Sequence, residues 1–64
     1  MGQSYSSRQI IKLIQKDGWE LKNVEGDHHH FVHPTKPGIT TVPHPVKDLP
    51  KGTANSILRQ AGLK

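Results

Sequence analysis

The stretch "DGWELKNVEGDHHHFV", residues 17–32, contains the end of a helix, two strand patterns and the turn between them. Its opening Asp-Gly pair ends the helix, because glycine adopts the left-handed conformation of a helix end at little cost. Apolar and polar residues then alternate over residues 19–24 until the last pair, Asn23 and Val24, which is typical of a half-buried strand. Gly26 provides the turn, and a second strand follows over residues 28–34. The stretch therefore predicts a helix that leads into a β-hairpin.

The second strand divides the histidine run between its two faces, because successive side chains of a strand point in opposite directions. One face carries His29, Phe31 and His33, and the other carries His28, His30 and Val32. Phe31 is the largest apolar group of the run and is expected to face the core. His29 and His33 are therefore expected to be structural. The opposite face of the strand is expected to be open.

Three further elements flank the hairpin. Ser6 and Gln9 form a capping-box pattern ahead of an apolar periodicity, which predicts a helix over residues 7–17. A proline-glycine turn and a β-branched run predict a third strand over residues 39–42. Apolar residues at helical spacing predict a last helix over residues 52–61.

The resulting order of helix, strand, strand, strand and helix predicts an α+β fold in two layers. Three antiparallel strands leave one face to be covered, and the two amphipathic helices cover it. Trp19 and Phe31 are expected in the core rather than on a surface that stacks bases. We expect one domain over residues 1–64, with residues 1–5 frayed at the amino end.

Composition narrows the class of protein. The chain has no cysteine, which excludes disulfides and thiolate metal sites. No apolar run has the length of a signal peptide or a membrane span, so we expect a soluble cytoplasmic protein. Nine Lys and Arg against five Asp and Glu give a formal charge of +4. This charge favours a polyanionic partner such as a nucleic acid, and a basic surface kept for solubility is the alternative.

The five histidines allow three interpretations. In the first they bind a metal, because His28 and His30 share a strand face and Asp27 or His44 supplies a third ligand. In the second, one imidazole performs acid-base chemistry near neutral pH. In the third they are ordinary strand or turn residues, and the sequence leaves the role of His44, between two prolines, undecided.

RNA is a substrate for which one imidazole is enough. Its 2′-hydroxyl is a built-in nucleophile, so an enzyme must deprotonate it, protonate the leaving oxygen and stabilise the added negative charge. A weak ribonuclease of this kind needs no metal, no cofactor and no deep pocket. A small basic domain with histidines on an open sheet face meets these demands.

Three segments together resemble the HicA toxin family, also described as YcfA-like messenger-RNA interferases. They are "LIQKDGWEL", "GDHHHFVHP" and "ITTVPHPVKDLPKGTANSILRQAGL", and the resemblance covers residues 7–63 in the family's order and spacing. It implies a double-stranded-RNA-binding-domain-like fold and the toxin role in a type II toxin–antitoxin pair. It also implies endoribonuclease activity on messenger RNA and a HicB-like antitoxin that covers the catalytic surface.

The same resemblance implies that His28 is the catalytic residue, since it is the first histidine after the glycine and the small polar residue of the turn. Gly26 and Asp27 form that active-site turn. Asp27 departs from the family, in which serine is more familiar at this position. A register slip of one residue would give the catalytic role to His29 on the opposite face.

Other residues complete the expected site. Supporting roles are expected for His29, His30 and His44, and contacts to RNA phosphates for Lys36, Lys47 and Lys51. The start of the last helix favours anions, because its backbone N–H groups and dipole carry positive charge. The alternative function is a non-catalytic double-stranded-RNA-binding module, which reads RNA shape and usually needs basic residues where the last helix begins.

Overall fold

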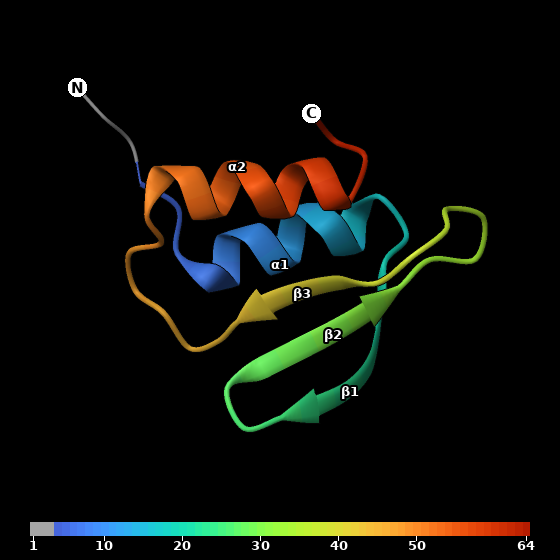
Figure 1. Ribbon diagram of the computed structural model, residues 1–64, viewed down its shortest axis with the longest axis horizontal. Helices are drawn as coiled ribbons and strands as arrows, with labels where there is room; N and C mark the ends of the chain where they lie inside the picture. Colours follow the sequence, from blue (N-terminus) through green and yellow to red (C-terminus); the bar gives the residue numbers. More distant parts are fainter. Residues whose placement is uncertain (1–3) are drawn as a thin grey trace.

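The computed structural model describes residues 4–64 and places two helices over one face of a three-stranded antiparallel sheet (Figure 1). In chain order the elements are α1 (Ser7–Lys16), β1 (Glu20–Glu25), β2 (His28–Val32), β3 (Thr40–Pro43) and α2 (Lys51–Gln60). The strands lie in the order β1-β2-β3. The predicted α+β fold of the double-stranded-RNA-binding type is confirmed, with its element order and its open second face.

Helix α1 begins at the predicted capping box. The Ser6 hydroxyl accepts from the Gln9 backbone N–H at 3.2 Å, and the Gln9 side chain accepts from the Ser6 backbone N–H at 2.9 Å. The helix ends one residue earlier than predicted, and Asp17 caps it. Gly18 follows with φ +112°, and a Cβ atom there would lie 2.7 Å from the His33 Nε2 atom. Glycine is therefore required both by the backbone conformation and by the close approach of an imidazole ring.

The strand boundaries differ from the predicted ones by one or two residues. Strand β2 stops at Val32 rather than at residue 34, because the next ring, His33, turns to bond the end of α1. Strand β3 starts at Thr40 and includes Pro43, which pairs with His28 at the edge of the ladder. A proline at the last position of a strand removes no interior ladder hydrogen bond.

Strand β1 is exposed along its whole length, so the prediction of a half-buried strand is wrong. The helices pack over β3 and against each other, and β1 contacts only β2 among the major element pairs. An irregularity between Leu21 and Asn23 also changes the phase of the alternation. It places Leu21 opposite Phe31 and Val24 opposite His29, on the face that the helices would cover if they reached β1. Leu21 and Val24 are instead 49% and 47% exposed.

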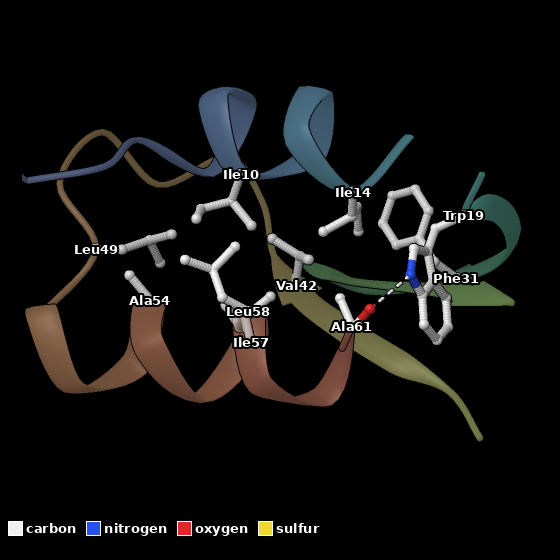
Figure 2. Close-up of a cluster of buried hydrophobic side chains, with 10 residues drawn as sticks. All are labelled: Ile10, Ile14, Trp19, Phe31, Val42, Leu49, Ala54, Ile57, Leu58 and Ala61. Carbon is white, nitrogen blue, oxygen red and sulfur yellow. Dashed lines mark hydrogen bonds between the residues drawn. The ribbon is translucent and has the colours of Figure 1, made fainter. Parts of the chain in front are cut away.

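The core lies between the helices and the sheet (Figure 2). Its buried apolar residues are Ile10, Ile14, Trp19, Phe31, Val42, Leu49, Ala54, Ile57, Leu58 and Ala61. The predicted core positions of Trp19 and Phe31 are confirmed. The indole N–H of Trp19 donates to the Ala61 carbonyl oxygen at 3.2 Å, which satisfies its only polar atom and ties β1 to the end of α2.

The amino end is described from Ser4 onward, so residues 1–3 of the expected frayed segment lie outside the described residues. Ser4 and Tyr5, which belong to this segment, make hydrogen bonds to the loop before α2. The Ser4 hydroxyl donates to the Asp48 carboxylate at 3.0 Å, and the Leu49 backbone N–H donates to the Tyr5 carbonyl at 2.8 Å. Within residues 4–64, no helix combines the length and the apolar character that crossing a membrane requires.

Candidate active site

One end of the sheet, on the left in Figure 1, gathers the β1–β2 turn, the end of β3 and the starts of both helices. We call it the turn end and define it by residues 25–30, residues 41–47 and Ser7. Gly26 has φ +58°, a conformation that favours glycine, and it allows the tight reversal between Glu25 and His28. The predicted turn residues therefore occupy the turn, directly before the histidine run.

The turn is held by a backbone hydrogen bond from the segment after β3. The His44 backbone N–H donates to the Asp27 carbonyl oxygen at 2.7 Å. The Asp27 carboxylate itself points into solvent, and its Oδ1 atom lies 3.9 Å from His28 Nε2. An exposed pair at this separation contributes little to stability. Asp27 thus fixes the turn through its backbone, which any residue can supply.

His28 opens β2 with its imidazole accessible to solvent. Its side chain is 59% exposed, and no group within residues 4–64 forms a hydrogen bond to its ring. The ring lies on the face of the sheet that carries no helix, opposite the side of Phe31. Both ring nitrogens are therefore available to a substrate.

His30 shares this open face with His28, and the two ring centroids lie 6.5 Å apart. Its Nε2 atom lies 2.9 Å from the Glu25 carboxylate, and its Nδ1 atom 2.9 Å from the Thr41 hydroxyl. Because a carboxylate only accepts, Nε2 carries the proton toward Glu25. In the neutral ring, Nδ1 then accepts from the Thr41 hydroxyl. His30 is thus anchored by side chains of both neighbouring strands, and these two partners had no signal in the sequence.

His29 and His44 form a second pair on the opposite face. Their rings meet edge to face, with centroids 4.9 Å apart and planes at 87°. The His29 Nδ1 atom is buried and has no hydrogen-bond partner within residues 4–64. His28 with His30, and His29 with His44, therefore occupy separate surfaces, as the alternation along the strand predicted.

Ser7, which no sequence pattern indicates as a site residue, positions His44. The serine is 1% exposed, and its hydroxyl lies 2.6 Å from His44 Nδ1 while accepting from the Val46 backbone N–H at 2.8 Å. The buried hydroxyl proton needs an acceptor, and the His44 Nδ1 atom is the one beside it. Nδ1 therefore accepts, and the proton of the neutral His44 ring lies on Nε2.

The family comparison covers the turn, the strand and the closing helix. The model described as "HicA toxin of bacterial toxin-antitoxin" matches residues 7–63. The chain belongs to the HicA toxin family. A comparison with curated proteins gave no match. As a HicA family member, the chain has the role of a toxin in a toxin–antitoxin pair, and its partner is a cognate antitoxin.

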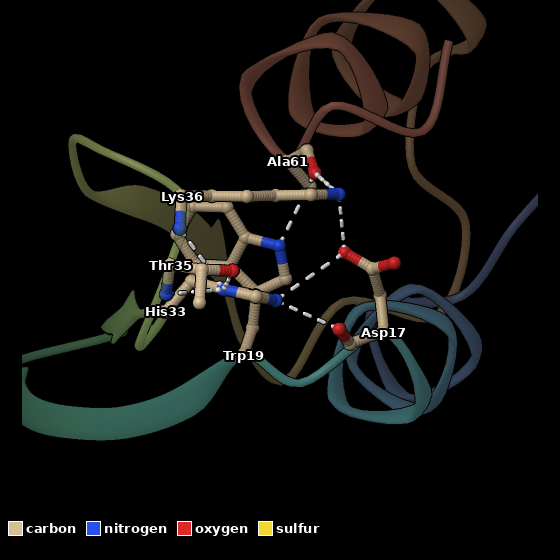
Figure 3. A network of polar contacts seen from close by, with 6 residues as sticks. All are labelled: Asp17, Trp19, His33, Thr35, Lys36 and Ala61. Atoms are coloured by element: carbon tan, nitrogen blue, oxygen red, sulfur yellow. Dashed lines mark hydrogen bonds and ion pairs between the residues drawn. The ribbon is translucent and has the colours of Figure 1, made fainter.

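A polar network lies at the opposite end of the sheet (Figure 3). We call it the tryptophan end and define it by Asp17, Trp19, His33, Thr35, Lys36 and Ala61. The His33 Nε2–H donates to the Asp17 carbonyl oxygen at 2.8 Å, and His33 Nδ1 accepts from the backbone N–H groups of Thr35 and Lys36, each at 3.1 Å. The His33 side chain is 8% exposed and packs edge-on against Trp19, with centroids 5.3 Å apart. The structural role predicted for His33 agrees with these contacts.

Lys36, for which a contact with RNA phosphate was predicted, belongs to this network, and that contact stays a prediction. Its ammonium donates to the Asp17 carboxylate at 2.5 Å and to the Ala61 carbonyl at 3.1 Å. The hydrogen bond from Lys36 is the main cause that lowers the pKa of Asp17 below its ordinary value. Lys36 thus joins the ends of the two helices, at the opposite end of the sheet from the turn (Figure 1).

The other two lysines predicted to contact RNA phosphates lie away from this network. Lys47 lies in the loop after β3, and Lys51 is the first residue of α2. Both side chains are exposed.

For the metal alternative, no three His, Asp or Glu side chains within residues 4–64 converge as a ligand set would require. His30 has both nitrogens engaged, and His44 lies on the face opposite His28.

Proposed function

We propose that this toxin is an endoribonuclease that cleaves messenger RNA, with His28 as the general acid/base and with no metal ion. The observation that carries the proposal is the state of the His28 ring. It is exposed and free of hydrogen bonds within residues 4–64, on a turn that Gly26 and a backbone hydrogen bond hold in place. A general base needs a nitrogen that the substrate can reach.

The chemistry requires few groups from the protein. Neutral His28 accepts the proton of the RNA 2′-hydroxyl while the 2′-oxygen attacks the adjacent phosphorus, and the bond from phosphorus to the 5′-oxygen breaks. The leaving 5′-oxygen takes up a proton from a water molecule, and the protonated His28 then gives its proton to the solvent. His30, anchored 6.5 Å from His28, supports the site by fixing the strand surface beside it. Lysines stabilise the added negative charge.

The RNA path in this proposal runs over the turn end. Lys47 and Lys51 supply positive charge there, whereas Lys36 is committed to Asp17 and Ala61. Asp27 and Glu25 are the two carboxylates of the turn end, and Glu25 is paired with His30. A HicB-like antitoxin would neutralise the toxin in the cytoplasm by covering the open face that carries His28.

The decisive experiment compares His28→Ala with Lys12→Ala, an exposed control on α1. A synthetic RNA measures cleavage in vitro, growth after induction measures toxicity, and circular dichroism checks the fold. His28→Ala is expected to lower the cleavage rate by about 100-fold or more, because one positioned imidazole is worth about 10²–10⁴. The control should cleave as the wild type does.

Three outcomes would contradict the proposal. Full activity of His28→Ala would remove His28 from the mechanism. Cleavage that EDTA abolishes and zinc restores would favour the metal alternative. RNA that is bound but never cleaved by the wild type would favour the non-catalytic double-stranded-RNA-binding module.

A further inference from the structure

A pocket of about 500 Å³ lies beside the start of α1, on the helix side of the turn end. Its lining consists of Ser6, Ser7, Arg8, His44, Pro45, Val46 and Lys47. These residues provide two cationic side chains, an imidazole and hydroxyl groups, and no carboxylate. We propose that this pocket binds a phosphate group of the RNA backbone next to the scissile one. The proposal rests on the proposed ribonuclease function and adds to it a second contact with the substrate.

The two cations of the pocket have no carboxylate partner. Arg8 and Lys47 are exposed, and the ion pairs within residues 4–64 involve other groups. Asp48 follows Lys47 in the chain, but its carboxylate accepts from the Ser4 hydroxyl and does not line the pocket. Two unpaired cations around one concave surface favour an anion there.

His44, which also lines the pocket, adds a hydrogen-bond donor to these charges. Ser7 holds the Nδ1 side of its ring, so the proton of the neutral ring lies on Nε2. The Nε2 atom has no hydrogen-bond partner within residues 4–64 and is not buried. A phosphate oxygen is an acceptor that suits this donor, and the buried serine keeps the ring from rotating away.

The pocket is physically joined to the active-site turn. The same residue, His44, donates its backbone N–H to the Asp27 carbonyl, one residue before His28. Its ring, however, packs against His29 on the face opposite the His28 ring. One phosphate cannot therefore reach both rings in this geometry, and a strand that crosses the turn end would place a neighbouring phosphate in the pocket.

An RNA phosphate fits the pocket better than a protein partner does. The centres of protein interfaces are rich in aromatic and apolar anchors. The large exposed apolar residues of the described chain are Tyr5, Leu13, Leu21, Val24, Ile39 and Leu63, and none lines this pocket. Phosphate contacts, in contrast, are made by Arg, Lys, hydroxyl and backbone N–H groups.

The test measures binding without cleavage. The probe is a fluorescent 2′-O-methyl RNA oligonucleotide, which lacks the 2′-hydroxyl nucleophile, and anisotropy gives its Kd at several KCl concentrations. The pocket variant is Arg8→Gln with Lys47→Gln, and the control is Arg59→Gln with Lys12→Gln, which removes the same charge from exposed positions outside the pocket. The pocket variant is expected to bind about 10-fold more weakly and to lower the salt slope by about 0.7, the value for one single-strand phosphate.

The control variant is expected to weaken binding by less than about 3-fold, because its charges act only at long range. A second variant, His44→Asn, keeps an acceptor for Ser7 and removes the Nε2 donor, so it should also weaken binding of the probe. Inorganic phosphate provides a direct check, since it should shift the backbone amide signals of Arg8 and Lys47 in an NMR titration.

Two results would overturn the pocket proposal. Equal losses in the pocket and control variants would mean that net charge alone matters. Unchanged RNA binding together with weakened antitoxin binding would assign the pocket to the protein partner. The probe is not cleaved, so the binding test does not depend on the result of the cleavage test. If His28→Ala kept full activity, the measured Kd values would still decide whether the pocket binds RNA.

Discussion

At the tryptophan end of the sheet, His33 uses both ring nitrogens within the fold, whereas at the turn end His28 uses neither. His44 is intermediate, with one nitrogen bonded to Ser7 and the other accessible. The three rings belong to the same residue type, and each lies in a strand of the sheet or directly after one. The structural His33 differs from the candidate catalytic His28 in the hydrogen-bonding capacity that the fold leaves unfilled.

The tryptophan end and the turn end of the sheet also make different contacts with helix α1. At its last turn, Asp17 offers its backbone carbonyl to His33 and its carboxylate to Lys36, and Trp19 packs over the network. At its first turn, Ser7 binds a ring whose far side stays open. The last turn of the helix therefore helps to complete the core, whereas its first turn lies beside the pocket for which we propose a phosphate ligand.

The largest expected effect on stability comes from removing His33. His33→Ala leaves the Asp17 carbonyl and two backbone N–H groups without their partner and opens space beside Trp19. We expect a loss of about 2–4 kcal/mol in the free energy of unfolding, measured by urea denaturation. His28→Ala, at an exposed position, should change it by less than about 0.5 kcal/mol. Equal losses in the free energy of unfolding for the two variants would contradict the difference between the tryptophan end and the turn end.

A smaller loss is expected at the turn end from Ser7→Ala. The change leaves the buried Val46 N–H without its acceptor and releases the His44 ring. We expect a cost of about 1–3 kcal/mol by urea denaturation. Ser56→Ala, on the exposed side of α2, is the control and should change stability little. A Ser7→Ala variant as stable as the control would mean that Ser7 does not hold His44.

Acid should weaken the tryptophan end through Asp17. Lys36 lowers the pKa of this carboxyl in the folded state, so the ionised form stabilises the fold. Its contribution is present above the unfolded value of about 3.9 and is lost as pH falls through the lower folded pKa. The Tm of the wild type should therefore fall at acid pH, and that of Asp17→Asn should start lower and fall less. Parallel curves from pH 7 to acid would contradict this role.

The smallest effect is expected from Asp27→Ser. The carboxylate is exposed and 3.9 Å from His28 Nε2, and the turn depends on the Asp27 backbone carbonyl, which serine retains. The cleavage rate of the synthetic RNA should change by less than about 5-fold, since exposed pairs contribute about 1 kcal/mol or less. A larger change would mean that the carboxylate takes part in the reaction.

Local features of the fold were predictable from the sequence because neighbouring residues determine them. The capping box at Ser6, the end of α1 at Gly18 and the core side of Phe31 each follow from a pattern of a few residues. The exposure of β1 was not predictable in this way. It depends on how far the helices reach across the sheet and on the irregularity between Leu21 and Asn23, which are properties of the packed molecule.

In the candidate site, too, features that neighbouring residues determine were predictable, and features that depend on distant contacts were not. The separation of His28 from His29 follows from strand alternation and is observed. The roles of Ser7 and Lys36 depend on contacts 37 and 19 residues away in the chain, and no pattern near either residue indicates them. The catalytic role of His28 stays a prediction.

The uncovered strand β1 has a consequence for solubility. One of its edges pairs with β2, and the other is the edge of the sheet, beside two exposed apolar side chains, Leu21 and Val24. Free edges of this kind promote intermolecular strand pairing, and charged residues on them oppose it. Glu20, Lys22 and Glu25 lie along this strand. The charged residues of β1 are therefore expected to oppose aggregation of the isolated toxin.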